Sequence, residues 1–138
     1  MNIKIDSIPA SGSLTLTEKI EPRSLDLETP VIHFREPIMA RHSVSRGINV
    51  VSLDSTIEAK LSLTCCRCLC EYTQNFSKKF KFNFAIDKSI QFIDTTDSIR
   101  EELFLSYPLK PLCRLDCKGL CSVCGGNLNE RGCFCATT

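Results

Sequence analysis

Apolar and polar residues alternate along two stretches in the middle of the chain. The first stretch has apolar side chains at every second position, at Ile57, Ala59, Leu61 and Leu63. The second stretch repeats the pattern at Phe80, Phe82, Phe84 and Ile86. A period of two is typical of a strand with one buried face. We therefore predict a long antiparallel hairpin, within a run of antiparallel strands that extends from residue 31 to residue 86.

One helix is predicted after these strands. Ser98 and Glu101 have the spacing of a capping box, in which each side chain bonds the other residue's backbone N–H where a helix starts. Ile99, Leu103 and Phe104 then fall on one helical face. We expect a helix of about ten residues that ends before Pro108.

Residues 107–138 differ in composition from the rest of the chain. Proline and glycine interrupt this segment, and it has too few large apolar residues for a core of its own. Such a segment needs a staple to fold. We therefore predict an α+β fold, with a mainly antiparallel β domain and one short helix in residues 1–106. Residues 107–138 are predicted to form a cysteine-rich zinc-knuckle tail that packs on this domain.

The overall composition excludes several classes of protein. A length of 138 residues suits one domain with at most a small appendage. A formal net charge of +1 excludes a strongly basic or acidic chain, and the 43% of hydrophobic residues is typical of globular proteins. The sequence has no apolar run of 18 residues and no secretion signal at its start. We expect a cytoplasmic protein with no membrane partner.

Cysteine is the exceptional residue, with ten in the chain. Four lie within residues 65–70 and six within residues 113–135. In a reducing compartment, clustered cysteines bind metal more often than they form disulfides. Zinc prefers four ligands in a tetrahedron, and a close pair of cysteines directs two sulfurs at one ion. The chain offers four pairs, enough for two zinc ions: Cys65 and Cys68, Cys113 and Cys117, Cys121 and Cys124, and Cys133 and Cys135.

These four pairs, numbered in chain order, can be combined in two ways. The third pair can join the fourth across a short loop that contains Asn127-Leu128-Asn129, which leaves the first pair to join the second. We favour this combination because a short loop has a low closure entropy. In the alternative, the second pair joins the third and the first joins the fourth. Cys66 and Cys70 remain as buried small residues or as substitute ligands.

Other uses of these residues agree less well with the sequence. Adjacent cysteines such as Cys65 and Cys66 cannot form a disulfide with each other without strain. A catalytic zinc site needs an open position, whereas a site with four thiolates is closed and structural. Iron–sulfur ligation is a minor alternative. Motifs for phosphate binding or nucleophilic catalysis are absent, and His33 and His42 suit surface or core positions. We predict no enzymatic activity and no small-molecule substrate.

Positive charge accompanies the cysteines. Residues 60–81 contain five basic residues and one acidic residue, and residues 107–138 contain four basic and two acidic residues. A basic surface of this kind can bind RNA phosphate or an acidic protein. Its candidate residues are Arg67, Lys78, Lys110, Arg114 and Lys118. The phenylalanines of residues 76–84 can also stack on bases, although their period favours a buried strand face.

Several motifs together resemble a known family. They are Cys65-x-Arg67-Cys68-Leu69, Glu101-Glu102-Leu103, Tyr107-Pro108-Leu109-Lys110-Pro111-Leu112-Cys113, Asp116-Cys117-Lys118-Gly119-Leu120-Cys121, Cys124-Gly125-Gly126-Asn127-Leu128-Asn129-Glu130 and Cys133-Phe134-Cys135. Over residues 48–135 the chain resembles the YceD family, described as large ribosomal RNA subunit accumulation proteins of bacteria and plastids. The chain departs from the family pattern at Cys66, at Cys70, at Ser122, where proline is commoner, and at Arg131-Gly132.

The resemblance implies a role in ribosome biogenesis, through processing or stability of the large-subunit ribosomal RNA, and no known enzymatic activity. We therefore predict a non-enzymatic zinc-binding factor whose partner is large-subunit ribosomal RNA or a ribosome-assembly protein. The alternative is a zinc- or redox-responsive regulatory module that binds a protein partner. In that alternative, Cys66 or Cys70 is a reactive thiol beside Arg67.

Overall fold

Antiparallel strands dominate the structure, a computed structural model that describes residues 1–130 and 132–135. In chain order the elements are β1 (Asn2–Lys4), the 3-10 turn η1 (Ile5–Ser7), β2 (Ser13–Ile20), the 3-10 turn η2 (Pro22–Leu25), β3 (Ile32–Phe34), β4 (Ile38–Arg46), β5 (Val50–Thr64), β6 (Glu71–Ala85), β7 (Phe92–Asp94) and α1 (Thr96–Leu105). The predicted fold class is confirmed in outline, because the described residues form mainly antiparallel sheets, one α-helix and a cysteine-rich C-terminal segment. The division between residues 106 and 107 stays a prediction. No helix within the described ranges is long and apolar enough to cross a membrane.

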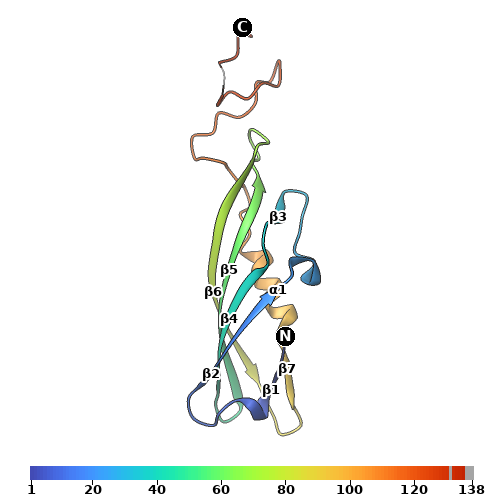
Figure 1. Cartoon of the computed structure of the whole chain (residues 1–138), viewed down its shortest axis with the longest axis vertical. Helices are drawn as coiled ribbons and strands as arrows, with labels where there is room; N and C mark the ends of the chain where they lie inside the picture. The colour runs from blue at the N-terminus through green and yellow to red at the C-terminus, as the bar shows by residue number, and fades with distance from the viewer. Residues whose placement is uncertain (131, 136–138) are drawn as a thin grey trace.

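The longest feature is the hairpin of β5 and β6, with 15 residues in each strand. In the larger sheet, β2 pairs with β4, and both β4 and β3 pair with β5, at different parts of its length. β6 pairs with the opposite edge of β5 along its whole length. β1 and β7 form a small separate sheet. The last pair of the hairpin is Thr64 and Glu71, so residues 65–70 form its tip, as the alternation predicted. Figure 1 shows the C-terminal segment beyond this tip, at the opposite end from β1 and β7.

The apolar core lies on one face of the larger sheet, where α1 covers one part and the residues of β1, η1 and β7 cover another. Alternate residues of β5 are almost fully buried, namely Val51, Leu53, Ile57, Leu61 and Leu63. Ile99 and Leu103 of α1 pack against this face, and each buried side chain of this size contributes about 1.5–3 kcal/mol. The phenylalanines of β6 are half-buried against the same core, at Phe76, Phe80, Phe82 and Phe84. This packing supports the core interpretation of these rings over a stacking platform.

The helix starts earlier than predicted. α1 begins at Thr96, whose backbone N–H donates to Oδ1 of Asp94 at 2.9 Å. Ser98 is therefore already inside the first turn, and the capping box predicted for Ser98 and Glu101 is wrong. The physical reason is that Asp94, at the end of β7, accepts the bond that starts the helix. The apolar face of the helix is as predicted.

Candidate metal centres

The tip of the β5–β6 hairpin presents the first pair of cysteines. The backbone N–H of Cys65 donates to the carbonyl of Cys70 at 2.9 Å, and that of Leu69 donates to the carbonyl of Cys65 at 3.0 Å. Leu69 has a φ of 60°, a left-handed conformation that lets the chain reverse within a few residues. The turn holds Cys65 and Cys68 in buried positions, at 0% and 4% exposure.

Hydrogen bonds to backbone carbonyls hold the C-terminal segment against this tip. The N–H of Cys66 donates to the carbonyl of Pro111 at 2.9 Å, and Nη1 of Arg67 donates to the carbonyl of Cys117 at 2.9 Å. Gly119 has a φ of 78°, and a Cβ there would lie 3.2 Å from the carbonyl oxygen of Arg67. Glycine permits both the left-handed turn and the close approach of the two chain segments.

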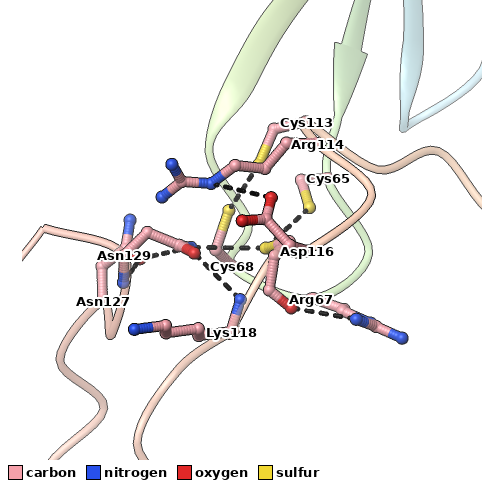
Figure 2. A network of polar contacts seen from close by, with 10 residues as sticks. Cys65, Arg67, Cys68, Cys113, Arg114, Asp116, Lys118, Asn127 and Asn129 are labelled. Carbon is pink, nitrogen blue, oxygen red and sulfur yellow. Dashed lines mark hydrogen bonds and ion pairs between the residues drawn. The ribbon is translucent and has the colours of Figure 1, made fainter.

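The first group of sulfurs joins the hairpin tip to the C-terminal segment. Its members are Cys65, Cys68, Cys113 and Cys117, and their sulfurs all lie within 4.8 Å of one another. The sulfurs of Cys65 and Cys117 are 3.7 Å apart, and those of Cys68 and Cys113 are 3.6 Å apart. Figure 2 shows Cys65 and Cys68 of the hairpin tip converging with Cys113 of the C-terminal segment. Three of the four residues are buried, and Cys113 is half-buried.

The second group lies entirely in the C-terminal segment. Its members are Cys121, Cys124, Cys133 and Cys135, with sulfurs again within 4.8 Å of one another. In the turn at residues 121–126, Cys121 donates its N–H to the carbonyl of Gly126 at 2.8 Å. The sulfur of Cys133 is 3.2 Å from that of Cys121 and 3.4 Å from that of Cys124. This group is more exposed than the first.

Both groups have a geometry that suits a metal ion. They correspond to the favoured combination, in which the first pair joins the second and the third joins the fourth. Metal–sulfur bonds of about 2.3 Å in a tetrahedron put neighbouring sulfurs about 3.8 Å apart. The separations of 3.6 and 3.7 Å in the first group are close to this value, and those of 3.2 and 3.4 Å in the second are somewhat shorter. Each donor set therefore fits one tetrahedral ion.

Hydrogen bonds favour a thiolate in each group. Burial raises the pKa of Cys65, but the backbone N–H groups of Cys68 and Cys113 and further hydrogen bonds outweigh burial and lower this pKa to about 6. The backbone N–H of Cys124, with other hydrogen bonds, lowers the pKa of Cys121 to about 6. The thiolate is the form of cysteine that binds metal. At least one cysteine of each group, Cys65 in the first and Cys121 in the second, is thus largely a thiolate near neutral pH.

Four of the five predicted basic residues lie in the hairpin tip or in the C-terminal segment that meets it. Arg67 is held by its bond to the carbonyl of Cys117, and Nε of Arg114 lies 3.9 Å from Oδ1 of Asp116. Lys110 and Lys118 are exposed, and neither has an ion-pair partner in the part of the chain that the structure describes. These two lysines are therefore the cations most available to an external anion.

Lys78 is not brought to the cysteine groups. It lies on β6 opposite Ile57, in a register that continues to the last hairpin pair at Glu71. At about 3.4 Å per residue, the strand places Lys78 roughly 24 Å from Glu71. Its charge lies in the middle of the hairpin. Lys78 is only 11 positions after Arg67 in the sequence, but an extended strand separates the two residues in space.

The structure also assigns positions to residues whose role the sequence left open. Cys66 is exposed and Cys70 is half-buried, and neither belongs to a group of four sulfurs. Asn127 and Asn129, which the sequence analysis named as loop residues and as part of a family motif, donate side-chain hydrogen bonds to the sulfurs of Cys70 and Cys117. The motif did not indicate these contacts, because the partner sulfurs are 57 and 12 positions away in the sequence.

Known proteins match mainly the C-terminal part of the chain. A family model described as "Large ribosomal RNA subunit accumulation protein YceD" matches residues 85–138. This segment is similar to YceD proteins. The predicted resemblance to the YceD family is thus confirmed for this part, while the first pair of cysteines lies before the matched residues.

One curated relative supports the same similarity. The large ribosomal RNA subunit accumulation protein YCED homolog 1, chloroplastic, of Arabidopsis thaliana is 42% identical over 43 residues. The aligned residues are 31% of this chain and 13% of that YceD relative, so the chain spans a small part of its length. No solved structure matches the chain.

Proposed function

We propose that this chain binds two zinc ions and acts as a non-enzymatic factor in the accumulation of large-subunit ribosomal RNA. One observation carries the proposal: six of the eight grouped cysteines lie within the residues that match the YceD family. The names of the family and of the chloroplast relative both refer to accumulation of the large ribosomal RNA subunit. The chemistry of the cysteine groups and of the basic residues around them supports the finer parts of the proposal.

Zinc has a structural role in this proposal. The ligands are the four sulfurs of each group, and soft thiolates suit zinc better than hard cations. Four thiolates complete a tetrahedral shell and leave no open position for a substrate. When bound, the ion supplies cross-links that a segment without an apolar core needs. Because neither ion would have an open position, we propose no enzymatic activity.

The proposed RNA contact is the basic surface beside the first group, defined by Lys110, Arg114 and Lys118. Lys110 and Lys118 lack internal ion-pair partners among the described residues, and the bond of Arg114 to Asp116 is long at 3.9 Å. Exposed ion pairs of this kind are weak, so phosphate can compete for Arg114. Arg67 is excluded from this set because its guanidinium supports the carbonyl of Cys117.

The test is a titration of large-subunit ribosomal RNA fragments at several salt concentrations, with zinc content measured in every sample. The test variant combines Lys110→Ala, Arg114→Ala and Lys118→Ala. The matched control combines Lys78→Ala, Lys79→Ala and Lys81→Ala, which removes the same charge from the middle of the hairpin. Each lost phosphate contact reduces the salt dependence of binding by roughly one unit. We expect the test variant to lose roughly three units and the control to change little.

Three results would contradict parts of this proposal. A chain without metal after purification under reducing conditions would reject the zinc sites. Loss of binding in the control alone would move the RNA contact to the hairpin and restore Lys78 as a binding residue. Unchanged RNA binding in both variants, with zinc retained, would mean that the role in RNA accumulation acts through a protein partner.

The exposed thiol of Cys66 favours a second candidate function, the zinc- or redox-responsive regulatory module. Cys66 is adjacent to a proposed ligand but outside both groups, so an oxidant can reach it without first displacing zinc. Mild oxidant separates the two functions. Release of zinc from the wild type but not from Cys66→Ser would support the regulatory module, and retention of zinc in both would support the structural role.

A further inference from the structure

The loop that connects the two halves of the second group folds back onto the first group. Nδ2 of Asn129 donates to the sulfur of Cys117 at 3.3 Å and to Oδ1 of Asn127 at 2.9 Å. The backbone N–H of Lys118 donates to Oδ1 of Asn129 at 2.9 Å. Figure 2 shows both asparagines and Lys118 beside the first group. The amide of Asn129 is therefore oriented by one bond on its oxygen while its nitrogen faces a proposed ligand.

A second amide ties the same loop to the hairpin tip. Nδ2 of Asn127 donates to the sulfur of Cys70 at 3.1 Å, and Cys70 is one of the two cysteines that neither group of four includes. The backbone N–H of Leu128 donates to the carbonyl of Gly119 at 2.9 Å, and Leu120 pairs with Asn127 in an isolated bridge. Residues 127–129 thus contact the hairpin tip and the segment around Gly119 at the same time.

Residues of the second group flank this loop on both sides. Its two ends are held by the turn at residues 121–126 and by Cys133, and the sulfur of Cys133 lies within 3.4 Å of both other sulfurs that it contacts. When a metal closes the second group, both ends of the loop are fixed. When the group is open, the loop keeps its contacts with Gly119 and Leu120 but loses its anchor at Cys133. Ordering the amides against Cys117 and Cys70 then costs more conformational entropy.

We propose that Asn127 and Asn129 couple the two metal sites, so that metal binding at the second site strengthens binding at the first. This inference rests on the proposed zinc function. Hydrogen bonds from an amide N–H to a ligand thiolate orient the ligand and stabilise its charge, and loss of such a contact typically lowers metal affinity 10–100-fold. Coupling free energies between sites are reciprocal, so filling the first site strengthens the second by the same factor. Asn129 is the main positioning residue, because it touches a ligand sulfur directly.

The experiment is a thermodynamic cycle on the full chain, with Co²⁺ as a spectroscopic probe of thiolate ligation. One variant opens the second group, by Cys133→Ser with Cys135→Ser, and leaves only the first site. The second variant is Asn129→Ala, and a third combines both changes. Stability of the β domain is followed by circular dichroism in all four proteins. The coupling is the difference between the effects of opening the second group with and without Asn129.

We expect opening of the second group to lower the affinity of the first site roughly 5–150-fold in the wild type, and by much less in Asn129→Ala. A further variant, Asn129→Asp, keeps the shape and can still accept the bond from the Lys118 N–H, but its oxygen cannot donate to the Cys117 sulfur. It should weaken the first site at least as much as Asn129→Ala. The matched control is Asn75→Ala, an exposed asparagine of β6, which should leave both sites unchanged.

The outcomes separate this inference from the proposed function. If the wild type binds two ions, but opening of the second group and Asn129→Ala have additive effects on the affinity of the first site, the coupling is overturned and the zinc function stays intact. Full first-site affinity in Asn129→Asp would also overturn it, because the contact would then be mere packing. Absence of metal in the wild type would overturn both. Non-additive effects together with loss of affinity in Asn129→Asp would support the coupling.

Discussion

At the scale of single residues, His42 is an ionisable side chain buried in the apolar core. Its Nδ1 lies 2.8 Å from Oγ of Ser55, and its Nε2 lies 3.4 Å from Oε1 of Glu18. Burial lowers the pKa of His42 below its usual 6.5 and outweighs the Glu18 carboxylate, which raises it. Below about pH 6.5 the unfolded chain therefore takes up the proton on His42 more readily than the folded protein does. The free energy of unfolding is highest above about pH 6.5 and decreases as the pH falls from there toward the lowered pKa of the folded protein.

We expect His42→Gln to reduce this pH dependence, because glutamine does not titrate. Urea midpoints of the wild type and the variant at about pH 8 and about pH 5.5 measure it, with two-state unfolding assumed for both. Acid also protonates the thiolates, but the two proteins have the same cysteines, so this effect cancels in the difference. If the midpoints of both proteins fall equally, His42 does not contribute to the acid sensitivity.

At the scale of elements, α1 is held to the sheet by a few large side chains. Leu103 is 1% exposed against the core, whereas Leu105, two residues later on the same helix, is 73% exposed. Leu103→Ala removes buried contacts and leaves a cavity, so it should lower the free energy of unfolding by about 2–5 kcal/mol. Leu105→Ala is the matched control, with an expected change within about 0.5 kcal/mol. Denaturant unfolding of both variants checks this, and similar losses would show that α1 does not pack on the sheet as described.

At the scale of the whole molecule, the apolar core and the cysteine groups occupy different regions. The apolar clusters involve residues up to Tyr107, and the cluster at the hairpin tip consists largely of cysteines. Tyr107, the first residue of the predicted tail, still packs on the apolar core, and the division between residues 106 and 107 stays a prediction. Because the core and the cysteine groups are separate, we expect the two regions to depend on metal to different degrees.

Removal of metal should disorder residues 113–135 while the β domain stays folded. Thiolate ligands compete with protons, so lower pH should release metal in the same way as a chelator. Amide NMR spectra before and after chelation under reducing conditions measure this, and addition of zinc should restore the original spectrum. Unchanged tail signals after verified removal of metal would show that the tail folds by itself.

Features that depend on neighbouring residues alone could be predicted from the sequence. A period of two is a property of one strand, so the hairpin of Ile57–Leu63 and Phe80–Ile86 was predictable, as was its cysteine tip. The spacing within each cysteine pair is equally local, and it predicted eight candidate ligands. The helix start failed at this same scale, because Asp94 and Ser98 are both able to bond a helix N-terminus and only the end of β7 selects between them.

Which distant residues meet depends instead on the path of the folded chain. Cys65 and Cys117 are 52 positions apart, so their contact depends on where the chain returns after α1. The same return brings Asn127 to the sulfur of Cys70 in the hairpin tip, while Asn129 of the same loop lies against the sulfur of Cys117. Lys118 lies beside the first group, and the straight extension of β6 keeps Lys78 away from it. Spacing along a chain defines a pair of ligands, but the combination of pairs is set by the path of the backbone between them, which the packing of α1 and the sheet determines.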